Sequence, residues 1–306
     1  MSTGNFHIKY QAREDFNKAR SKATISQLLN ALTPERQKLL SLDDVRQLLR
    51  PRSEIYRGMR AVAIDNIVGS EGRYNDFTSA FLPKRDFIRG RWESVDRAHL
   101  ADVNLPAIKL YEIGGVYFVR DGNHRVSVAK TQGIEAIDAE VVELDSEIKL
   151  RPGMSAAELK DEVIHYEKRK VFRETKLDTV IPPEEINFSE PGRYEEMIGH
   201  IQGHKYFLNQ GIEEEIPFLD AAASWYNKVY KPIIHLIERE RIIYGFPGRS
   251  MSDLYMWIVK HWDDLKQKHG NDFSLHQAVL DYSMKYGQSP RKKISNFFSK
   301  LRKALF

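Results

Sequence analysis

The residues best suited to chemistry lie in one short segment, Asp121 to Arg125, with the sequence DGNHR. An apolar run that predicts a strand precedes it, and a run from Val126 to Gln132 that predicts a helix follows it. The first amides of such a helix point into the preceding segment, and the helix dipole favours an anion there. Gly122 would let a ligand approach the backbone closely. The pattern therefore predicts an anion cradle suited to polyphosphate.

The side chains of this segment have distinct predicted roles. Arg125 offers a fork of donors that matches phosphate, with Asn123 beside it in the phosphate-binding segment. His124 adds a further donor and can act as an acid or base. Asp121 can hold the segment, or a Mg²⁺ ion that rides on phosphates. The alternative is a structural turn, because Asp-Gly is a common turn dipeptide; Arg125 would then be only a surface charge.

A second loop, residues 69–74 with the sequence GSEGRY, is a candidate for the same site. Glu71 would act as a base or metal ligand there, and Arg73 would donate to phosphate. Asp76 and Asp86 are further acidic candidates. The alternative is a plain surface turn.

The elements around these loops predict an α+β chain in which a small α/β domain is embedded in mostly helical sequence. Within that domain, apolar runs predict strands at 61–64, 107–113, 116–119 and 137–144, and Gly114-Gly115 predicts a hairpin turn. The expected organisation is a helical segment (1–55), the α/β domain (56–150), a charged helix and linker (151–195), a C-terminal helical domain (196–288) and a basic amphipathic tail helix (289–306).

Composition narrows the function classes. The chain has 306 residues, of which 42% are hydrophobic and 29% are charged, as expected for a folded protein with a core. It contains no cysteine, which excludes disulfides, cysteine-ligated zinc, iron–sulfur clusters and thiol nucleophiles. The first residues lack the apolar stretch of a secretory signal, and no run reaches the length of a membrane span. The expected compartment is therefore cytoplasmic.

The net charge of the C-terminal tail is more positive than that of the whole chain. Residues 284–306 hold seven basic residues and no acidic one, although the net charge of the whole chain is only +4. One face of the predicted 289–306 helix is apolar and the other is basic; the apolar face consists of Ile294, Phe297, Phe298, Leu301 and Leu305. Such a helix suits an anionic membrane surface, a nucleic-acid backbone or a partner groove. The alternative is that its apolar face docks on the C-terminal domain.

Three features of the C-terminal half each allow a functional and a structural interpretation. His200 and His204 are four residues apart, a spacing that binds metal on a helix but more often reflects packing. Arg249 precedes a helix start and could hold an anion, or could simply flank a cap formed by Ser250. The aromatic residues around Trp225 and Trp257 predict core packing rather than a stacking platform.

The segment YFVRDGNHRVSVAKTQG, preceded by ESVDRAHLADVNLPAIKLYEIGG, resembles the ParB/sulfiredoxin-like fold. The resemblance implies that the loop binds nucleotide phosphates: CTP in ParB proteins, ATP in sulfiredoxin and ADP in a related free-serine kinase. By this match Gly122, His124 and Arg125 form the phosphate loop. Ser94 and Arg97 would reach the phosphates from the preceding helix.

The segments GSEGRYNDFTSAFLP and FPGRSMSDLYMWIVKHW extend this likeness to bacterial ParB-like proteins described as nucleases or transcriptional regulators. The chain departs from both named relatives. Without cysteine it cannot perform sulfiredoxin chemistry, and one long charged helix predicted at 155–177 replaces the helix-turn-helix of ParB proteins.

The leading expectation is therefore a nucleotide-binding protein that hydrolyses ATP, ADP or CTP, or transfers a phosphoryl group to a small acceptor, with Mg²⁺ as cofactor. Glu71, Asp121 and His124 would be catalytic. A non-enzymatic DNA-binding regulator and a ParB-like nuclease are the alternatives.

Overall fold

The computed structural model describes residues 3–29, 38–211, 213–270 and 273–288. The chain divides into two compact units, residues 1–163 and 164–306. The predicted helical segment 1–55 and the predicted domain 56–150 both belong to the first unit. The predicted tail helix 289–306 lies outside the described residues. Mixed helix and sheet structure confirms the α+β class in general terms.

The first unit contains a six-stranded mixed sheet with the order β1-β3-β5-β4-β6-β2. The strands are β1 (Leu40–Ser41), β2 (Glu54–Ala63), β3 (Ile67–Ser70), β4 (Ile108–Ile113), β5 (Val116–Asp121) and β6 (Ala136–Leu144). β4 and β5 form the predicted antiparallel hairpin, and both turn glycines, Gly114 and Gly115, have positive φ. β3 pairs with β5, and β4 with β6, in parallel.

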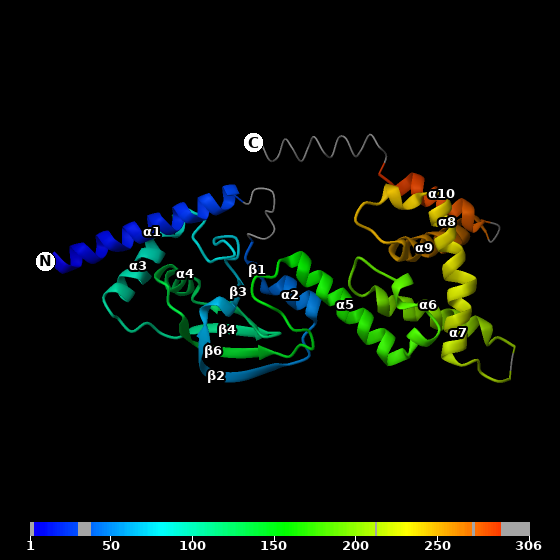
Figure 1. The fold of residues 1–306 in the computed structure, drawn as a ribbon, viewed down its shortest axis with the longest axis horizontal. Coiled ribbons are helices and arrows are strands. Elements are labelled where there is room, and N and C mark those ends of the chain that lie inside the picture. The colour runs from blue at the N-terminus through cyan, green and yellow to red at the C-terminus, as the bar shows by residue number, and fades with distance from the viewer. Residues whose placement is uncertain (1–2, 30–37, 212, 271–272, 289–306) are drawn as a thin grey trace. The chain divides into compact units, whose positions relative to one another are not determined.

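Helices cover the sheet and complete its core. They are α1 (Thr3–Leu29), α2 (Leu42–Leu49), α3 (Arg89–Leu100) and α4 (Asn123–Gln132), and Figure 1 shows α1, α3 and α4 gathered on one side of the strands. Phe16 of α1, Trp92 of α3 and Val126 of α4 are fully buried together with Leu110 and Val119 of the sheet. The burial of these large apolar side chains holds α3 and α4 in fixed positions on the sheet.

A buried hydrogen-bond chain fixes the long loop between β3 and α3 against α4. The Trp92 Nε1 donates to Ser127 Oγ at 2.8 Å, and Ser127 Oγ donates to the Phe81 carbonyl at 2.6 Å. Trp92, Phe81 and Ser127 are all fully buried. This chain secures the loop that carries Glu71 and Arg73.

The second unit is helical. It contains most of α5 (Ala156–Thr175), then α6 (Arg193–Leu208), α7 (Phe218–Trp225), a π-helical turn (Tyr226–Tyr230), α8 (Lys231–Arg239), α9 (Met251–His269) and α10 (Leu275–Tyr286). Capping boxes begin α9 at Ser250 and α10 at Ser274, as the sequence predicts for Ser250 with Asp253. The 178–194 loop contains short 3₁₀ turns, and α6 begins at Arg193.

The structure favours packing roles for the candidate residues of this unit. Trp225 is 1% exposed, and its Nε1 donates to the Tyr255 hydroxyl, which also contacts His200 Nδ1 at 3.1 Å. His204 instead contacts Ser224 Oγ at 3.0 Å, so the two histidines have separate partners. Arg249 pairs with Glu190 and lies over the ring of Trp257. Metal binding by the histidine pair and anion binding by Arg249 therefore gain no support.

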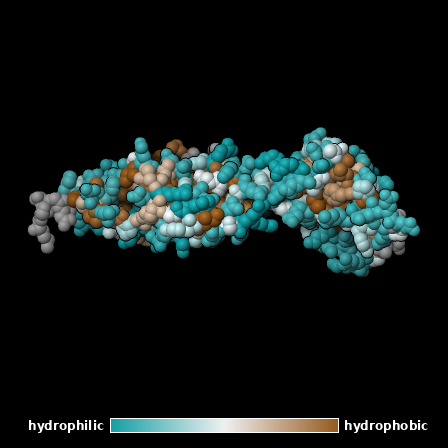
Figure 2. Space-filling view, turned by 90° about the horizontal axis from the view of Figure 1, so that it is seen from below, coloured by the Kyte–Doolittle hydropathy of each residue, from teal (hydrophilic) through white to brown (hydrophobic). Residues whose placement is uncertain are grey.

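Polar residues make up most of the face that Figure 2 presents, and hydrophobic residues lie there in smaller groups. Among the described helices, none combines the length and the apolar character needed to cross a lipid bilayer.

Candidate functional site

Gly122 alone separates β5 from α4. β5 continues to Asp121 and α4 begins at Asn123. One residue therefore connects them, where the sequence predicts a loop of five residues, 121–125. Gly122 has φ 112° and ψ 20°, a backbone conformation that other residues rarely adopt. A Cβ at this position would lie 2.5 Å from Ile108 Cγ2. The glycine therefore permits the turn and its close packing on β4, and ligand access at this position stays a prediction.

Asn123, His124 and Arg125 form the first turn of α4. The amide of Val126 donates to the Gly122 carbonyl at 3.0 Å, which is the first bond of the helix. An α-helix leaves the amides before this bond without helical acceptors, and its dipole is positive there. No described side chain caps this helix start. The N-terminal end of α4 is thus open to an anion.

A cavity of about 410 Å³ lies at this helix start. Its arginines come from four elements: Arg73 from the loop after β3, Arg91 from α3, Arg120 from β5 and Arg125 from α4. The other lining residues are Gly72, Val95, Asp121, Gly122, Asn123 and His124. Asp121 is the one acidic residue among these lining residues, so the cavity, called the cradle below, is strongly cationic.

The arginines of the cradle differ in their partners. Arg73 lies 3.8 Å from Asp76 and has a positive φ of 39°, an unusual conformation for a side-chain-bearing residue. The Arg120 guanidinium lies 5.6 Å from the ring centre of Tyr111. Arg91 is exposed, and its side chain forms neither an ion pair nor a hydrogen bond within the described part of the chain. Arg91 is therefore the arginine most available to a ligand.

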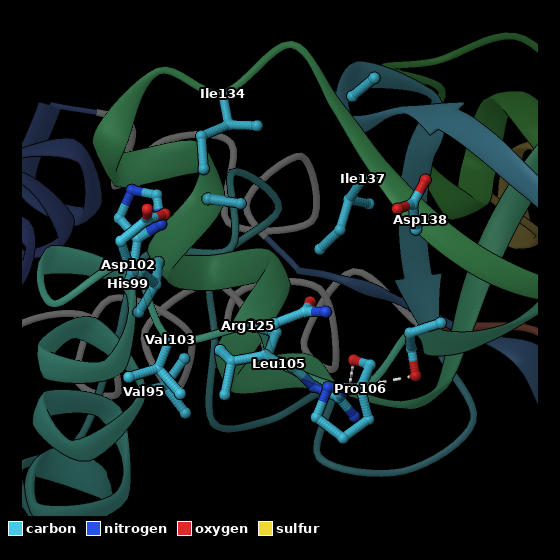
Figure 3. Close-up of a pocket in the computed structure, with 15 residues that line it drawn as sticks. Val95, His99, Asp102, Val103, Leu105, Pro106, Arg125, Ile134, Ile137 and Asp138 are labelled. Carbon is cyan, nitrogen blue, oxygen red and sulfur yellow. Dashed lines mark hydrogen bonds between the residues drawn. The ribbon is translucent and has the colours of Figure 1, made fainter.

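Arg125 is held by its own chain. Its guanidinium donates to Asp121 Oδ2 at 2.6 Å, to the Ala107 carbonyl at 3.1 Å and to the Pro106 carbonyl. Figure 3 shows this side chain directed toward Pro106. Arg125 thus ties α4 to the segment before β4, and Asp121 already accepts one of its hydrogen bonds. The same pair occupies the Asp121 carboxylate, the predicted ligand of Mg²⁺.

His124 is neutral at neutral pH in this environment. Burial, reinforced by the positive charges of Arg73 and Arg91, lowers the pKa of its imidazole to about 4. The ring meets Phe77 edge-on at 5.6 Å, and its buried Nδ1 has no partner among the described residues. His124 therefore carries no positive charge until an anion raises its pKa. A neutral imidazole still offers one donor and one acceptor.

Asn123 carries a second unpaired polar atom. Its side chain is 8% exposed, and its Oδ1 is buried with no hydrogen-bond partner in the described structure. Buried polar atoms are normally hydrogen-bonded. Asn123 Oδ1 and His124 Nδ1 are therefore two buried atoms of the cradle lining that could accept or donate a hydrogen bond to a ligand.

The remaining predicted residues lie partly outside the cradle. Glu71 is half-buried, and its amide donates to the Val119 carbonyl at 2.9 Å, which joins the loop to β5. Its neighbours Gly72 and Arg73 line the cradle but Glu71 does not. The other two acidic candidates are in ion pairs: Asp76 with Arg73, and Asp86 with Arg20 and Arg89.

The helix before the cradle presents residues that the sequence did not single out. Ser94 and Arg97 are absent from the cradle lining, and Arg91 and Val95 of the same helix line it instead. Val95 is buried, and Arg91 lies one turn before it on the same face. The buried stripe of α3 could have indicated Arg91. Arg120, which the sequence also missed, precedes Asp121 at the end of β5.

No family model, curated protein or solved structure matches this chain. The resemblance to ParB/sulfiredoxin-like proteins therefore stays a prediction. Within the described residues, no three or more histidine or acidic side chains are grouped as a metal site. What the cradle does must follow from its own residues.

Proposed function

We propose that the first unit binds the phosphate groups of a nucleotide in the cradle, as its resemblance to the ParB/sulfiredoxin-like fold implies. The observation that carries the proposal is the convergence of four arginines on the open start of α4, with a single acidic residue that is already paired to Arg125. Polyphosphate is the biological anion that matches several guanidinium forks and a helix start together.

We further propose that the bound nucleotide, ATP, ADP or CTP, undergoes hydrolysis or phosphoryl transfer to a small acceptor. Charge neutralisation and positioning supply most of the catalysis in such reactions. Arg73, Arg91 and Arg120 would neutralise phosphate charge, and His124 would donate a hydrogen bond as a neutral imidazole. Glu71, beside the cradle, is the candidate base.

The described residues do not form a prepared Mg²⁺ site. The Asp121 carboxylate is bonded to Arg125, and Glu71 does not line the cradle. Mg²⁺ commonly binds through one or two carboxylates together with substrate phosphates. A magnesium ion here would arrive on the nucleotide, and we assign it no step.

Isothermal titration calorimetry tests the binding proposal. ATP, ADP, CTP and GTP are titrated into the full chain, with and without Mg²⁺, at physiological salt. We expect at least one nucleotide to bind. Arg91→Ala should weaken that binding about tenfold, because it removes charge-assisted hydrogen bonds to phosphate. Arg97→Ala, an arginine of the same helix outside the cradle, is the matched control and should leave the affinity unchanged.

Two results would contradict the proposal. The first is that no nucleotide gives a heat of binding or raises the melting temperature, while the chain binds DNA in a salt-sensitive way. That result would favour the non-enzymatic regulator. The second is equal loss of affinity in Arg91→Ala and Arg97→Ala, which would place the ligand elsewhere. If a nucleotide binds, release of inorganic phosphate over time tests turnover, and Glu71→Gln should reduce turnover more than affinity.

A further inference from the structure

The four arginines of the cradle differ in how their side chains are held. Arg125 donates several hydrogen bonds, and Arg73 lies near a carboxylate. Arg91 and Arg120 are both exposed, and neither side chain forms an ion pair or a hydrogen bond within the described part of the chain. Arg120 nevertheless contacts an aromatic ring, whereas the described residues give Arg91 no such contact. These two arginines therefore form a matched pair with one difference.

A bulge in β5 places Arg120 at the cradle. Leu110 pairs with Val119, and Lys109 pairs with Asp121, so Arg120 is an extra residue that has no partner on β4. A β-bulge bends its strand locally and commonly redirects a side chain beside a functional site. Here the bulge lies at the end of β5, where the strand borders the cradle.

The aromatic ring beside Arg120 belongs to Tyr111 of β4. The Arg120 guanidinium carbon lies 5.6 Å from the centre of this ring, within the range of a cation–π contact. Tyr111 is 7% exposed, so the packed core around the ring holds it in place. Arg46 of α2 lies over the same ring at 4.5 Å, and its own charge is paired with Glu54 at 3.2 Å. Tyr111 therefore offers Arg120 a fixed surface.

We propose that Tyr111 is a positioning residue, which holds the Arg120 guanidinium ready for the phosphate groups that bind in the cradle. An exposed arginine loses rotamer freedom when it binds a ligand, and this loss weakens binding. A ring that already restricts the side chain removes part of the loss, and the N–H donors of the guanidinium stay free for the ligand. The inference rests on the proposed binding of phosphate in the cradle.

NMR relaxation of arginine side chains tests the positioning in the full chain without ligand. The order parameter of the Nε–Hε group should be higher for Arg120 than for Arg91. Tyr111→Leu should lower the Arg120 value to that of Arg91, and Tyr111→Phe, which keeps the ring, should preserve it. Equal order parameters for the two arginines in the unmodified chain would overturn the proposal, even if a variant fails to fold.

Calorimetry with inorganic pyrophosphate tests whether the positioning serves the cradle. Tyr111→Leu should weaken pyrophosphate binding about two- to fivefold, the value of an exposed cation–π contact. Tyr111→Phe should bind like the unmodified chain. Tyr111→Leu should have no further effect in the Arg120→Ala background, but should keep its full effect in the Arg91→Ala background. A merely structural role of Tyr111 would weaken binding equally in both backgrounds.

The failure of this proposal differs from the failure of the proposed function. If the unmodified chain binds neither pyrophosphate nor a nucleotide, phosphate binding in the cradle is refuted, and the role of Tyr111 falls with it. If pyrophosphate binds and Tyr111→Leu weakens it equally in both backgrounds, only the positioning role is overturned. Tighter binding by Tyr111→Leu would also overturn that role, because the ring would then draw the guanidinium away from the cradle.

Discussion

The buried imidazole of His124 should make the stability of the first unit depend on pH. Burial and the charges of Arg73 and Arg91 lower its pKa from 6.5 to about 4. At about 1.36 kcal/mol per pKa unit, this lowering of the pKa corresponds to roughly 3.4 kcal/mol. Because His124 is only partly buried, solvent screening reduces this to an expected value of about 2 kcal/mol.

The sign follows from proton uptake by the two states. The unfolded chain binds a proton at His124 below its ordinary pKa of 6.5, whereas the folded chain binds it only near pH 4. The contribution to stability is therefore fully present above pH 6.5 and is lost as the pH falls toward 4. Carboxylates also titrate in this range, so a single curve cannot isolate the histidine.

A comparison of variants isolates the contribution of His124 to stability. Urea unfolding is measured between about pH 7 and about pH 4.5 for the unmodified chain, for His124→Gln and for His99→Gln, an exposed histidine of α3. The free energy of unfolding of the unmodified chain should fall by about 1–2 kcal/mol more than that of His124→Gln across this range. His99→Gln should follow the unmodified chain. Parallel curves for the unmodified chain and His124→Gln would refute the burial argument.

An anion in the cradle should reverse the preference of His124 for the neutral form. A negative charge beside the imidazole raises its pKa, so anion affinity must increase as the pH falls. Sulfate is the suitable probe because, unlike phosphate, it does not titrate in this range. Calorimetry should show tighter sulfate binding at acidic pH in the unmodified chain, with a flatter dependence in His124→Gln. Identical pH dependence in both would place the anion away from His124.

Two further predictions concern the framework that holds the cradle. Ser127→Ala should lower the free energy of unfolding by about 2–4 kcal/mol, because it leaves the buried Trp92 Nε1 and the Phe81 carbonyl unpaired. Urea unfolding measures this change. A loss below about 0.5 kcal/mol would mean that water replaces the hydroxyl. Gly122→Ala should cost about 2–4 kcal/mol from its positive φ and its clash with β4, whereas Gly115→Ala, which also has positive φ but open space around it, should cost about 1–2 kcal/mol. Equal losses would show that backbone strain alone decides.

Local sequence signals predicted the framework of the site well. The glycine pair of the hairpin and the cap at Ser250 both depend on residues whose preferences are local. The sequence predicts the connection from strand to helix at the correct place, but it predicts five connecting residues where the structure has one, Gly122. Apolar periodicity cannot detect a first helical turn made of Asn123, His124 and Arg125, so the helix was expected to begin later.

Residues that depend on tertiary placement were harder to predict. Arg91 and Arg120 look like ordinary surface charges in the sequence, and only the packing of α3 and the end of β5 brings them to one cavity. The bonds of Arg125 to the Pro106 and Ala107 carbonyls join positions far apart in the chain, which no local pattern reveals. The sequence therefore indicated the kind of site, and folding decided which charges take part.

The pairing of Arg125 with Asp121 explains how a cationic cavity can exist before a ligand binds. Several guanidinium groups near one helix start repel one another, and Asp121 offsets part of that repulsion. Its carboxylate is 67% exposed, whereas the Arg125 side chain is 16% exposed, so the acid can turn into water while the arginine stays in place. A phosphate that displaces Asp121 would also meet Arg91 and the free amides of α4. The exchange would replace one exposed carboxylate by an anion with more partners, so a ligand that fits the cradle should stabilise the first unit.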